Sequence, residues 1–367
     1  MPSLSCSLKG RQQVIYLKQD RIASCCRAYP VPLEENFTGI QDRWKRESQS
    51  LDDGVRLPDC EHCWRDEDQG KISYRNLLNG KVGRRIELVA DNLCNHMCSY
   101  CSPKFSSMWE DSISALGPMR NVYASDIKNL TLIPARTTDP AKILAQIHDY
   151  IRSCDDPITV SVLGGEPLMQ IDALSTLLQF DLDEKITLEI ITNLNPPSTR
   201  FLEKILDLYR DRGKQLRFLI SLDATPTFNH VIRHGFDQER FYRCLDLVSQ
   251  SECNRSIIAT ISALGILDLP AYLEWLDRHE LTADFLPVNN PRSLQVSNVP
   301  LVIRQEVLSE LHDPMPVFVD QLSMPEASEI DRISCYQYLN QYFQRTGLDP
   351  ASVDHARFQL FWNDLRS

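Results

Sequence analysis

Short apolar runs alternate with segments of helical periodicity along most of this chain, from residue 85 to residue 311. Six of the runs are rich in β-branched or aromatic residues, and most are apolar almost throughout, as strands covered on both faces are. We predict a β-strand for each of them, at residues 85–90, 158–163, 186–192, 216–222, 256–263 and 284–288.

The segments between these runs carry the pattern of amphipathic helices. In residues 141–154, apolar side chains recur every three or four positions, and Asp139 with Pro140 supplies a helix start signal. A second segment opens on Ser198 and closes at Gly213, because glycine commonly ends helices. Further helices are expected at residues 170–180, 238–250, 269–280 and 302–311.

Six strand–helix units in sequence predict an α/β fold, with a parallel sheet, right-handed crossovers and closure or partial closure as a barrel. We assign residues 81–312 to this barrel, whose ligand is expected at the carboxyl ends of the strands. Residues 1–80 do not follow the alternation and read as a cysteine-rich, polar, loop-like extension. Residues 313–367 read as a helical tail. Its packing candidates are Ile330, Ile333, Tyr342 and Phe343.

The composition is that of a globular protein, with 43% hydrophobic and 24% charged residues. The net charge of −11, from 39 basic and 50 acidic residues, argues against a general phosphate-binding surface. The chain opens without an apolar signal region, and no apolar run approaches the ~18 residues of a membrane helix. We therefore expect a cytoplasmic protein, in which the 12 cysteines are metal ligands, reactive thiols and core residues and not disulfides.

Three of the cysteines, Cys94, Cys98 and Cys101, follow the first predicted strand within the segment CNHMCSYC. A structural zinc site uses four protein ligands. The fourth ligand here would have to come from a distant residue or from His96, whose place inside the triplet makes its reach awkward. A cubic iron–sulfur cluster held by three thiolates keeps one iron open to a further ligand. The triplet therefore favours an iron–sulfur cluster over zinc.

A second motif lies where the second predicted strand runs into GGEP, residues Gly164, Gly165, Glu166 and Pro167. The two glycines allow a ligand to approach the backbone closely, and the glutamate carboxylate can accept from an ammonium group. Alone, GGEP would indicate only a turn. Its place at the end of the next strand of the same barrel favours a site shared with the cysteine triplet.

Together these motifs resemble those of radical S-adenosylmethionine (SAM) enzymes. CNHMCSYC resembles their CxxxCxΦC signature, with Tyr100 in the aromatic position, and GGEP resembles their motif for the methionine part of SAM. Three further matches follow along the barrel. They are Thr192 and Asn193 in the place of a TNG motif, with Leu194 for its glycine; Ser221 and Asp223 in the place of an SxD pattern that contacts the SAM ribose; and Arg233 in the place of an arginine that meets the SAM carboxylate.

The resemblance covers roughly residues 85–290 and implies the partial (β/α)6 barrel of TIM type that this family uses. It also implies that Cys94, Cys98 and Cys101 hold a [4Fe-4S] cluster whose fourth iron binds the amino and carboxylate groups of SAM. One-electron reduction by a donor such as flavodoxin or ferredoxin would then cleave SAM to methionine and a 5′-deoxyadenosyl radical, which abstracts hydrogen from a substrate.

Five other cysteines lie upstream: Cys6, Cys25, Cys26, Cys60 and Cys63. The last two form a C-x2-C pair, which is typical of zinc and iron–sulfur sites. RIASCC, the helix-like IQDRWKRESQS and the segment DCEHCWRDEDQGKISYR resemble the N-terminal auxiliary-cluster module of some twitch/SPASM-type radical SAM proteins. That resemblance implies a second [4Fe-4S] cluster held by four of the five thiols, with Cys25 or Cys26 left over. Structural zinc is the alternative, with His62 as an alternative ligand.

The family resemblance implies hydrogen abstraction from a peptide or small metabolite, leading to oxidation, epimerisation or cross-linking. Modification of a nucleoside or nucleic acid is an alternative, although the acidic charge disfavours a large RNA surface. A noncatalytic zinc-bound interaction protein is a third hypothesis, and it would contain zinc without iron or acid-labile sulfide. The remaining helical cysteines are expected to be buried core residues; they are Cys154, Cys244 and Cys335.

Overall fold

The computed structural model describes residues 4–33, 37–70, 72–78, 83–130, 140–170 and 184–366, together with residues 132 and 175. The chain divides into two compact units, which we describe separately. Unit 1 comprises Met1–Asp91, Pro134–Ile191 and Arg212–Arg217, and unit 2 comprises Asn92–Ile133, Thr192–Asp211 and Phe218–Ser367. The module boundaries near residues 80 and 312 remain predictions.

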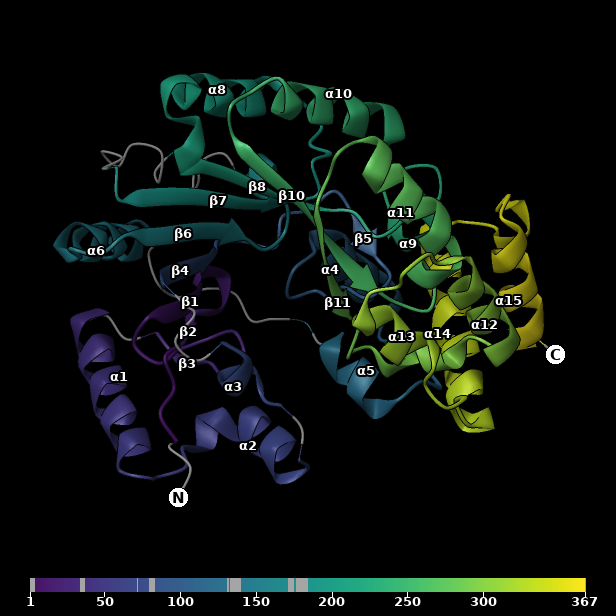
Figure 1. Ribbon diagram of the computed structural model, residues 1–367, viewed down its shortest axis with the longest axis horizontal. Helices are drawn as coiled ribbons and strands as arrows, with labels where there is room; N and C mark the ends of the chain where they lie inside the picture. Colours follow the sequence, from purple (N-terminus) through teal and green to yellow (C-terminus); the bar gives the residue numbers. More distant parts are fainter. Residues whose placement is uncertain are drawn as a thin grey trace. The chain divides into compact units, whose positions relative to one another are not determined.

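A mostly parallel sheet forms the centre of unit 1 (Figure 1). Its strand order is β7-β6-β4-β1-β2-β3, and the pairs β1–β4, β4–β6 and β6–β7 are parallel, while β2 pairs antiparallel with β1 and β3. Three of the predicted barrel strands are confirmed here. The strands are β1 (Gln12–Tyr16), β2 (Arg21–Ala23), β3 (Val31–Pro32), β4 (Arg84–Val89), β6 (Ile158–Leu163) and β7 (Ile186–Thr192).

The prediction of a loop-like N-terminal stretch is wrong for β1 and β3. β1 adds directly to the edge of β4, and Val14 and Ile15 are almost fully buried. The strand escaped prediction because it is short and opens with two glutamines. The polar side chain of Gln12 is accommodated because it donates to Glu87 Oε1 on the neighbouring strand at 2.8 Å. The N-terminal extension therefore shares a sheet with the first predicted barrel strand.

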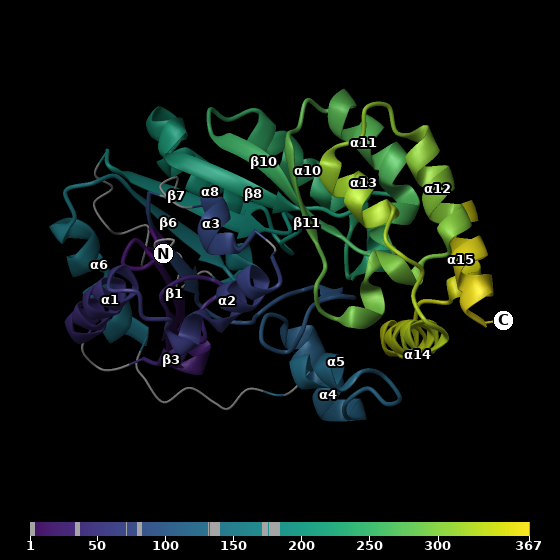
Figure 2. The ribbon, with the colours of Figure 1, turned by 60° about the horizontal axis from the view of Figure 1, so that its bottom comes forward.

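The helices of unit 1 include one that the sequence predicts in the N-terminal module, α1. Helices α1 and α6 lie side by side (Figures 1 and 2). Asp139 and most of the predicted helix at residues 170–180 lie outside the described residues. The helices are α1 (Phe37–Asp52), α2 (Glu61–Asp68), α3 (Tyr74–Leu78) and α6 (Pro140–Ser153), with 3-10 turns at Leu17–Gln19, Pro58–Cys60 and Pro167–Met169.

Unit 2 carries the later predicted strands, in the order β8, β10, β11, together with a small antiparallel ribbon of β5 and β9. Its strands are β5 (Met97–Cys98), β8 (Leu216–Ser221), β9 (Arg233–His234), β10 (Asn254–Ile261) and β11 (Ala283–Pro287). Its α-helices are α4 (Ser107–Leu116), α5 (Ala124–Asn129), α8 (Arg200–Leu208), α9 (Asn229–Ile232), α10 (Gln238–Ser249), α11 (Leu269–Arg278), α12 (Leu301–Glu310), α13 (Pro316–Leu322), α14 (Glu329–Thr346) and α15 (Ala356–Arg366). Helix α8 ends at Leu208, before the predicted end at Gly213, and a 3-10 segment at Arg210–Gln215 follows.

The fold is mixed α/β with a largely parallel sheet, as predicted. Helix α12 is the helix expected at residues 302–311, and helices α13, α14 and α15 lie in the predicted helical tail, where α14 packs against α15 (Figures 1 and 2). Tyr342 and Phe343 are buried there, but Ile330 and Ile333 are 72% and 53% exposed, so their predicted packing is wrong. They lie near the start of α14, on turns that face solvent.

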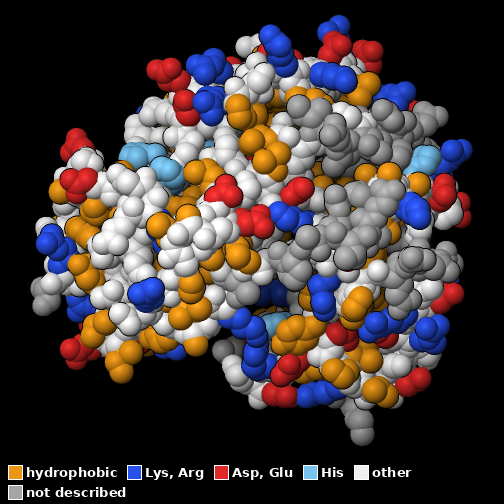
Figure 3. Space-filling model, turned by 180° about the vertical axis from the view of Figure 1, so that it is seen from behind, with side chains coloured by type: hydrophobic (Ala, Val, Ile, Leu, Met, Phe, Trp, Pro, Cys, Tyr) orange, Lys and Arg blue, Asp and Glu red, His pale blue; other side chains and the backbone are white. Residues whose placement is uncertain are grey.

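The surface carries charges of both signs. On the face shown in Figure 3, basic side chains are interspersed with acidic ones. Cys154, Cys244 and Cys335 are buried, as expected for small core residues. Among the helices of the described residues, none is long and apolar enough to cross a bilayer.

Candidate functional site

The cysteine triplet lies on a loop that begins soon after β4. Cys98 is buried, and Cys94 and Cys101 are partly buried. The start of α4 holds this loop from one side. The Ser107 hydroxyl accepts from the Cys94 N–H and donates to the Cys94 carbonyl oxygen, each at 3.1 Å, and the Trp109 indole donates to the Cys98 carbonyl oxygen at 2.8 Å.

Helix α14 holds the same loop through two buried tyrosines. The Tyr338 hydroxyl donates to the Ser99 carbonyl oxygen at 2.8 Å, and the Tyr342 hydroxyl lies 2.9 Å from the Met97 carbonyl oxygen. Sequence reasoning missed this role, because a tyrosine in a helical pattern indicates packing and does not reveal which carbonyl its hydroxyl reaches. The tail therefore supports the backbone that carries the triplet.

Burial and nearby charges set the acidity of the triplet. Burial raises the pKa of Cys98 to about 11, against the lowering effect of Arg233, whose Nη1 donates to the Cys98 Sγ at 3.7 Å. Burial and the neighbouring Cys98 raise the pKa of Cys101 to about 12. The Cys94 Sγ accepts from the His96 N–H at 3.4 Å. Iron–sulfur clusters are held by thiolates, and cluster binding would displace the protons of these three thiols. The nearby Arg233 cation and the His96 N–H group would stabilise the thiolates, so the triplet fits such a cluster.

Three of the predicted SAM-contacting residues form one buried group. The Asp223 carboxylate accepts from Tyr100 Oη at 2.5 Å, from Arg233 Nε at 2.7 Å and Nη2 at 3.1 Å, and from the Thr260 N–H at 2.8 Å. Because Arg233 also reaches Cys98, this group is directly connected to the triplet. The structure pairs the three residues with one another, and their contacts with SAM remain predictions. Ser221 is the last residue of β8.

The turn after β7 also contacts the cysteine loop. Asn193 Nδ2 donates to Asn95 Oδ1 at 3.0 Å, and Asn95 Nδ2 donates to the Asn195 carbonyl oxygen at 2.6 Å. Leu194 has a φ of 51°, in the left-handed region that favours glycine. Leu194 therefore adopts the backbone conformation that favours the glycine of a TNG motif at this position. Thr192 Oγ1 accepts from the Leu194 N–H at 2.9 Å.

The GGEP motif lies in unit 1, where its first glycine packs against β4. Gly164 and Gly165 have φ values of +85° and +58°. A Cβ at Gly164 would lie 2.4 Å from Val89 Cγ1, so only glycine fits without movement of β4. Glu166 is fully buried, and its Oε1 accepts from the Leu168 N–H at 3.0 Å, as the cap of a 3-10 turn that opens with Pro167.

The N-terminal cysteines come from segments that are bound to one another. The Tyr29 N–H donates to the Asp59 carbonyl oxygen at 3.1 Å, which holds the segment after Cys26 against the one before Cys60. Arg75 forms an ion pair with Glu67 of α2 at 2.7 Å and donates to the Ser5 carbonyl oxygen at 2.9 Å. Arg75, the last residue of the segment DCEHCWRDEDQGKISYR, thereby holds the start of the chain against the helix that carries Cys63.

Electrostatic interactions connect Cys6 with three of the other four N-terminal thiols. Burial comes first in raising the pKa values of Cys25 and Cys60 to about 12 and in raising that of Cys63. After burial, the neighbouring Cys26 raises the pKa of Cys25, and Cys6 raises the pKa values of all three thiols further. For Cys26, the charged neighbour after burial is instead Glu87, and its thiol bonds with Tyr74. Cys6 therefore interacts with Cys25, Cys60 and Cys63, while Cys26 interacts with Cys25, with Glu87 of β4 and with Tyr74 of α3.

Two further observations concern metal ligands. The alternative ligand His62 has its Nδ1 within 2.9 Å of Arg65 Nη2. Within the ranges that the structure describes, no three His, Cys, Asp or Glu side chains are grouped in the geometry of a site for a metal ion.

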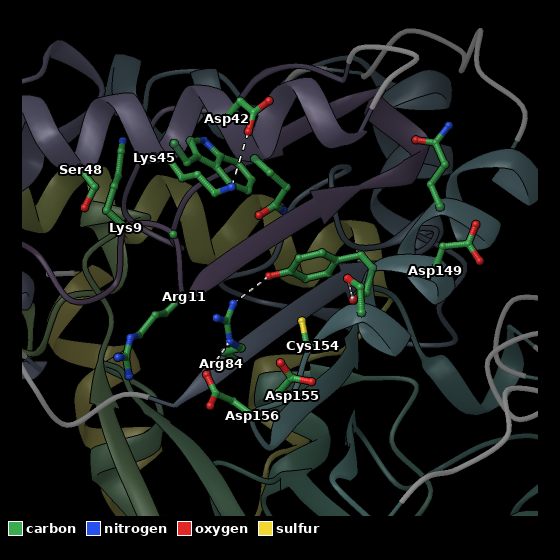
Figure 4. Close-up of a pocket in the computed structure, with 16 residues that line it drawn as sticks. Lys9, Arg11, Asp42, Lys45, Ser48, Arg84, Asp149, Cys154, Asp155 and Asp156 are labelled. Atoms are coloured by element: carbon green, nitrogen blue, oxygen red, sulfur yellow. Dashed lines mark hydrogen bonds and ion pairs between the residues drawn. The ribbon is translucent and has the colours of Figure 1, made fainter.

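A cavity of about 1050 Å³ also lies in unit 1, between α1, α6 and the start of β4 (Figure 4). It contains side chains of both charges, among them Arg84, which pairs with Asp156 at 3.0 Å. This cavity lies at the amino end of β4, whereas Gly164 packs against Val89 at the carboxyl end. Ligands of parallel α/β sheets bind at the carboxyl ends, so we do not assign the cofactor to this cavity.

Comparison with known proteins agrees with the motifs. Residues 91–269 match the family model of the radical SAM superfamily. The chain carries a radical SAM domain. The curated radical SAM cyclopropyl synthase TigE of Paramaledivibacter caminithermalis is 26% identical over 140 residues, which cover 36% of this chain and 28% of that protein. The radical SAM domain thus belongs to a superfamily of enzymes, while the chain aligns with less than a third of this relative.

Two solved structures of anSMEcpe are also similar to the chain. Native anSMEcpe with bound AdoMet matches with a TM-score of 0.41 and 12% identity, over 72% of this chain and 61% of that one. Native anSMEcpe with bound AdoMet and Cp18Cys peptide matches with a TM-score of 0.38 and 12% identity, over 55% of this chain and 50% of that one.

Proposed function

We propose that this chain is a radical SAM enzyme in which Cys94, Cys98 and Cys101 hold a [4Fe-4S] cluster. The observation that carries the proposal is a loop of three thiols, held from two sides, inside the radical SAM domain. When bound, the cluster and SAM supply a 5′-deoxyadenosyl radical that abstracts hydrogen from a substrate.

The chain's own residues position the cofactors. Arg233 next to Cys98 favours the thiolate form of that ligand, because a nearby cation stabilises a negative charge. Asp223 accepts from both Arg233 and Tyr100, so we assign it the orientation of these two side chains around the triplet. The other proposed SAM contacts are Gly164, Gly165, Glu166, Pro167, Thr192, Asn193 and Ser221.

We further propose that the N-terminal module holds a second [4Fe-4S] cluster through Cys6, Cys25, Cys60 and Cys63. The interactions of Cys6 with Cys25, Cys60 and Cys63 support this set of four. Cys26 interacts with Glu87, Tyr74 and Cys25 but not with Cys6, which favours Cys26 as the thiol left over. The substrate class is a peptide or small metabolite, by analogy with auxiliary-cluster radical SAM enzymes. The electron would come from a donor such as flavodoxin or ferredoxin.

The proposal is tested by anaerobic reconstitution with iron and sulfide, followed by SAM and dithionite, with quantification of 5′-deoxyadenosine. The control is the Cys94→Ala, Cys98→Ala, Cys101→Ala triple variant. We expect 5′-deoxyadenosine from the wild type and none from the variant.

If the iron-loaded wild type forms no 5′-deoxyadenosine, the EPR signal of the reduced cluster is recorded with and without SAM. A SAM-dependent change would mean that cleavage waits for substrate. An unchanged signal would contradict the proposal. Zinc without iron or sulfide in the purified protein would favour a noncatalytic interaction protein instead.

A further inference from the structure

Lys9 is a buried lysine within the N-terminal cysteine group. Its side chain is only 2% exposed, and its ammonium lies 2.8 Å from Glu47 Oε2 and 2.7 Å from Asp59 Oδ2. The same ammonium donates to the Cys60 Sγ at 3.9 Å. A lysine is seldom buried without partners. The two carboxylates provide them, and the contact with the thiol comes in addition.

The position of Lys9 in the chain connects three segments. Its N–H donates to the Cys6 carbonyl oxygen at 3.2 Å, so its backbone belongs to the turn that carries Cys6. Glu47 lies on α1, and Asp59 immediately precedes Cys60. Figure 4 shows Lys9 beside Ser48 of α1. One ammonium group therefore brings together the turn of Cys6, helix α1 and the turn of Cys60.

We propose that Lys9 holds the Cys60 thiolate and raises the reduction potential of the second cluster. This inference rests on the proposal that Cys6, Cys25, Cys60 and Cys63 hold that cluster. Hydrogen bonds to sulfur and local charge set the potentials of iron–sulfur clusters. Reduction adds one electron, and a fixed positive charge near a ligand stabilises the more negative state. Because Lys9 is buried, salt screens this interaction much less than that of an exposed pair.

The test uses the full chain with Cys94→Ala, Cys98→Ala and Cys101→Ala, so that only the second cluster is present. Lys9→Met is added, and the midpoint potential is measured by anaerobic titration with dithionite, followed by EPR. We expect a more negative midpoint, with at least a tenfold change in the reduction equilibrium constant, equivalent to about 59 mV for one electron. Lys45→Met is the matched control, because Lys45 lies on α1 with a side chain 78% exposed, and it should leave the midpoint unchanged.

Lys9→Arg, which keeps the charge, separates the electrostatic role from a structural one. If Lys9→Arg leaves the midpoint potential of the triple variant nearly unchanged, the proposal is supported, even if Lys9→Met loses its iron. An unchanged midpoint in Lys9→Met, or loss of iron in both Lys9 variants, would overturn it. If the triple variant itself bound no iron and sulfide, the second cluster would be refuted, and the role of Lys9 with it.

Discussion

His96 lies between the first two cysteines of the triplet and is 1% exposed. Burial, and then the Arg233 cation, lower its pKa from the ordinary value of 6.5 to about 3. The folded protein therefore keeps a neutral imidazole in a pH range where the unfolded chain takes up a proton. Stability is then lost as the pH falls from 6.5 toward 3, because the unfolded state binds more protons than the folded state.

We predict that His96→Gln removes part of this pH dependence in the metal-free protein. The free energy of unfolding of the wild type should fall by up to about 1.4 kcal/mol per pH unit below 6.5 through this residue, and the variant should lack that component. This pH dependence is measured by denaturant unfolding at several pH values between 5 and 7, with a resolution of about 1 kcal/mol in the free energy of unfolding. His312→Gln, at an exposed histidine, is the control. Equal slopes for wild type and His96→Gln would contradict the prediction.

The sequence suggests the residues of the proposed site, but it does not suggest their partners. The spacing of Cys94, Cys98 and Cys101 is visible in the sequence alone, because all three lie on one loop. The pairing of Asp223 with Arg233 depends on the fold, since ten residues and a helix separate them. Lys9 gave no signal, because a lysine in a polar stretch reads as exposed. The sequence therefore did not predict the roles of side chains that act through tertiary contacts.

The ribbon of β5 and β9 is the element that holds Cys98, and Gly235 follows directly after it. Cys98 pairs with Arg233 in this ribbon. Gly235 has a φ of +96°, and a Cβ there would lie 2.3 Å from the Asn95 carbonyl oxygen. That oxygen belongs to the cysteine loop. A side chain at Gly235 must therefore displace the backbone that carries the triplet.

We predict that Gly235→Ala destabilises the protein and lowers the iron bound at the triplet. The unfavourable backbone conformation alone costs roughly 1–3 kcal/mol, and the clash adds to it. Gly117→Ala is the matched control, since Gly117 also has a positive φ of +73° but no described atom lies within 4 Å of its Cβ position. Denaturant unfolding and iron analysis would show whether only Gly235→Ala loses iron. Equal iron in both variants would refute the role of the ribbon.

At the scale of elements, the strands with β-branched runs were predicted well, because their apolar residues are buried on both faces. β8 and β10 are found within two residues of the predicted bounds. β1 was missed because the two glutamines Gln12 and Gln13 at its start do not indicate a buried strand, although both are buried and Gln12 donates to Glu87 of β4. The ribbon of β5 and β9 was also missed, since two-residue strands have no periodicity to detect.

At the scale of the whole molecule, the two proposed clusters would have different chemical roles, which can be tested separately. The radical SAM domain spans residues 91–269, and the proposed second set of ligands lies between Cys6 and Cys63, outside it. Cleavage of SAM requires only the cluster of the triplet, because that cluster keeps the open iron position. Because four thiolates would leave no iron of the N-terminal cluster open, that cluster would then serve electron transfer or scaffolding.

We therefore predict different outcomes for variants of the two cysteine groups. The reconstituted wild type should contain about eight irons, and either the triplet variant or a Cys6→Ala, Cys25→Ala, Cys60→Ala, Cys63→Ala variant should contain about four. The N-terminal variant should still form 5′-deoxyadenosine, whereas the triplet variant should form none. Cys26→Ala is the matched control and should keep both the wild-type iron content and SAM cleavage, because its thiol interacts with Tyr74 and Glu87 instead of Cys6. If Cys26→Ala lost half of the iron, Cys26 and not Cys25 would be the fourth ligand. If the wild type contained about four irons together with zinc, the N-terminal cysteines would form a structural zinc site and not a second cluster.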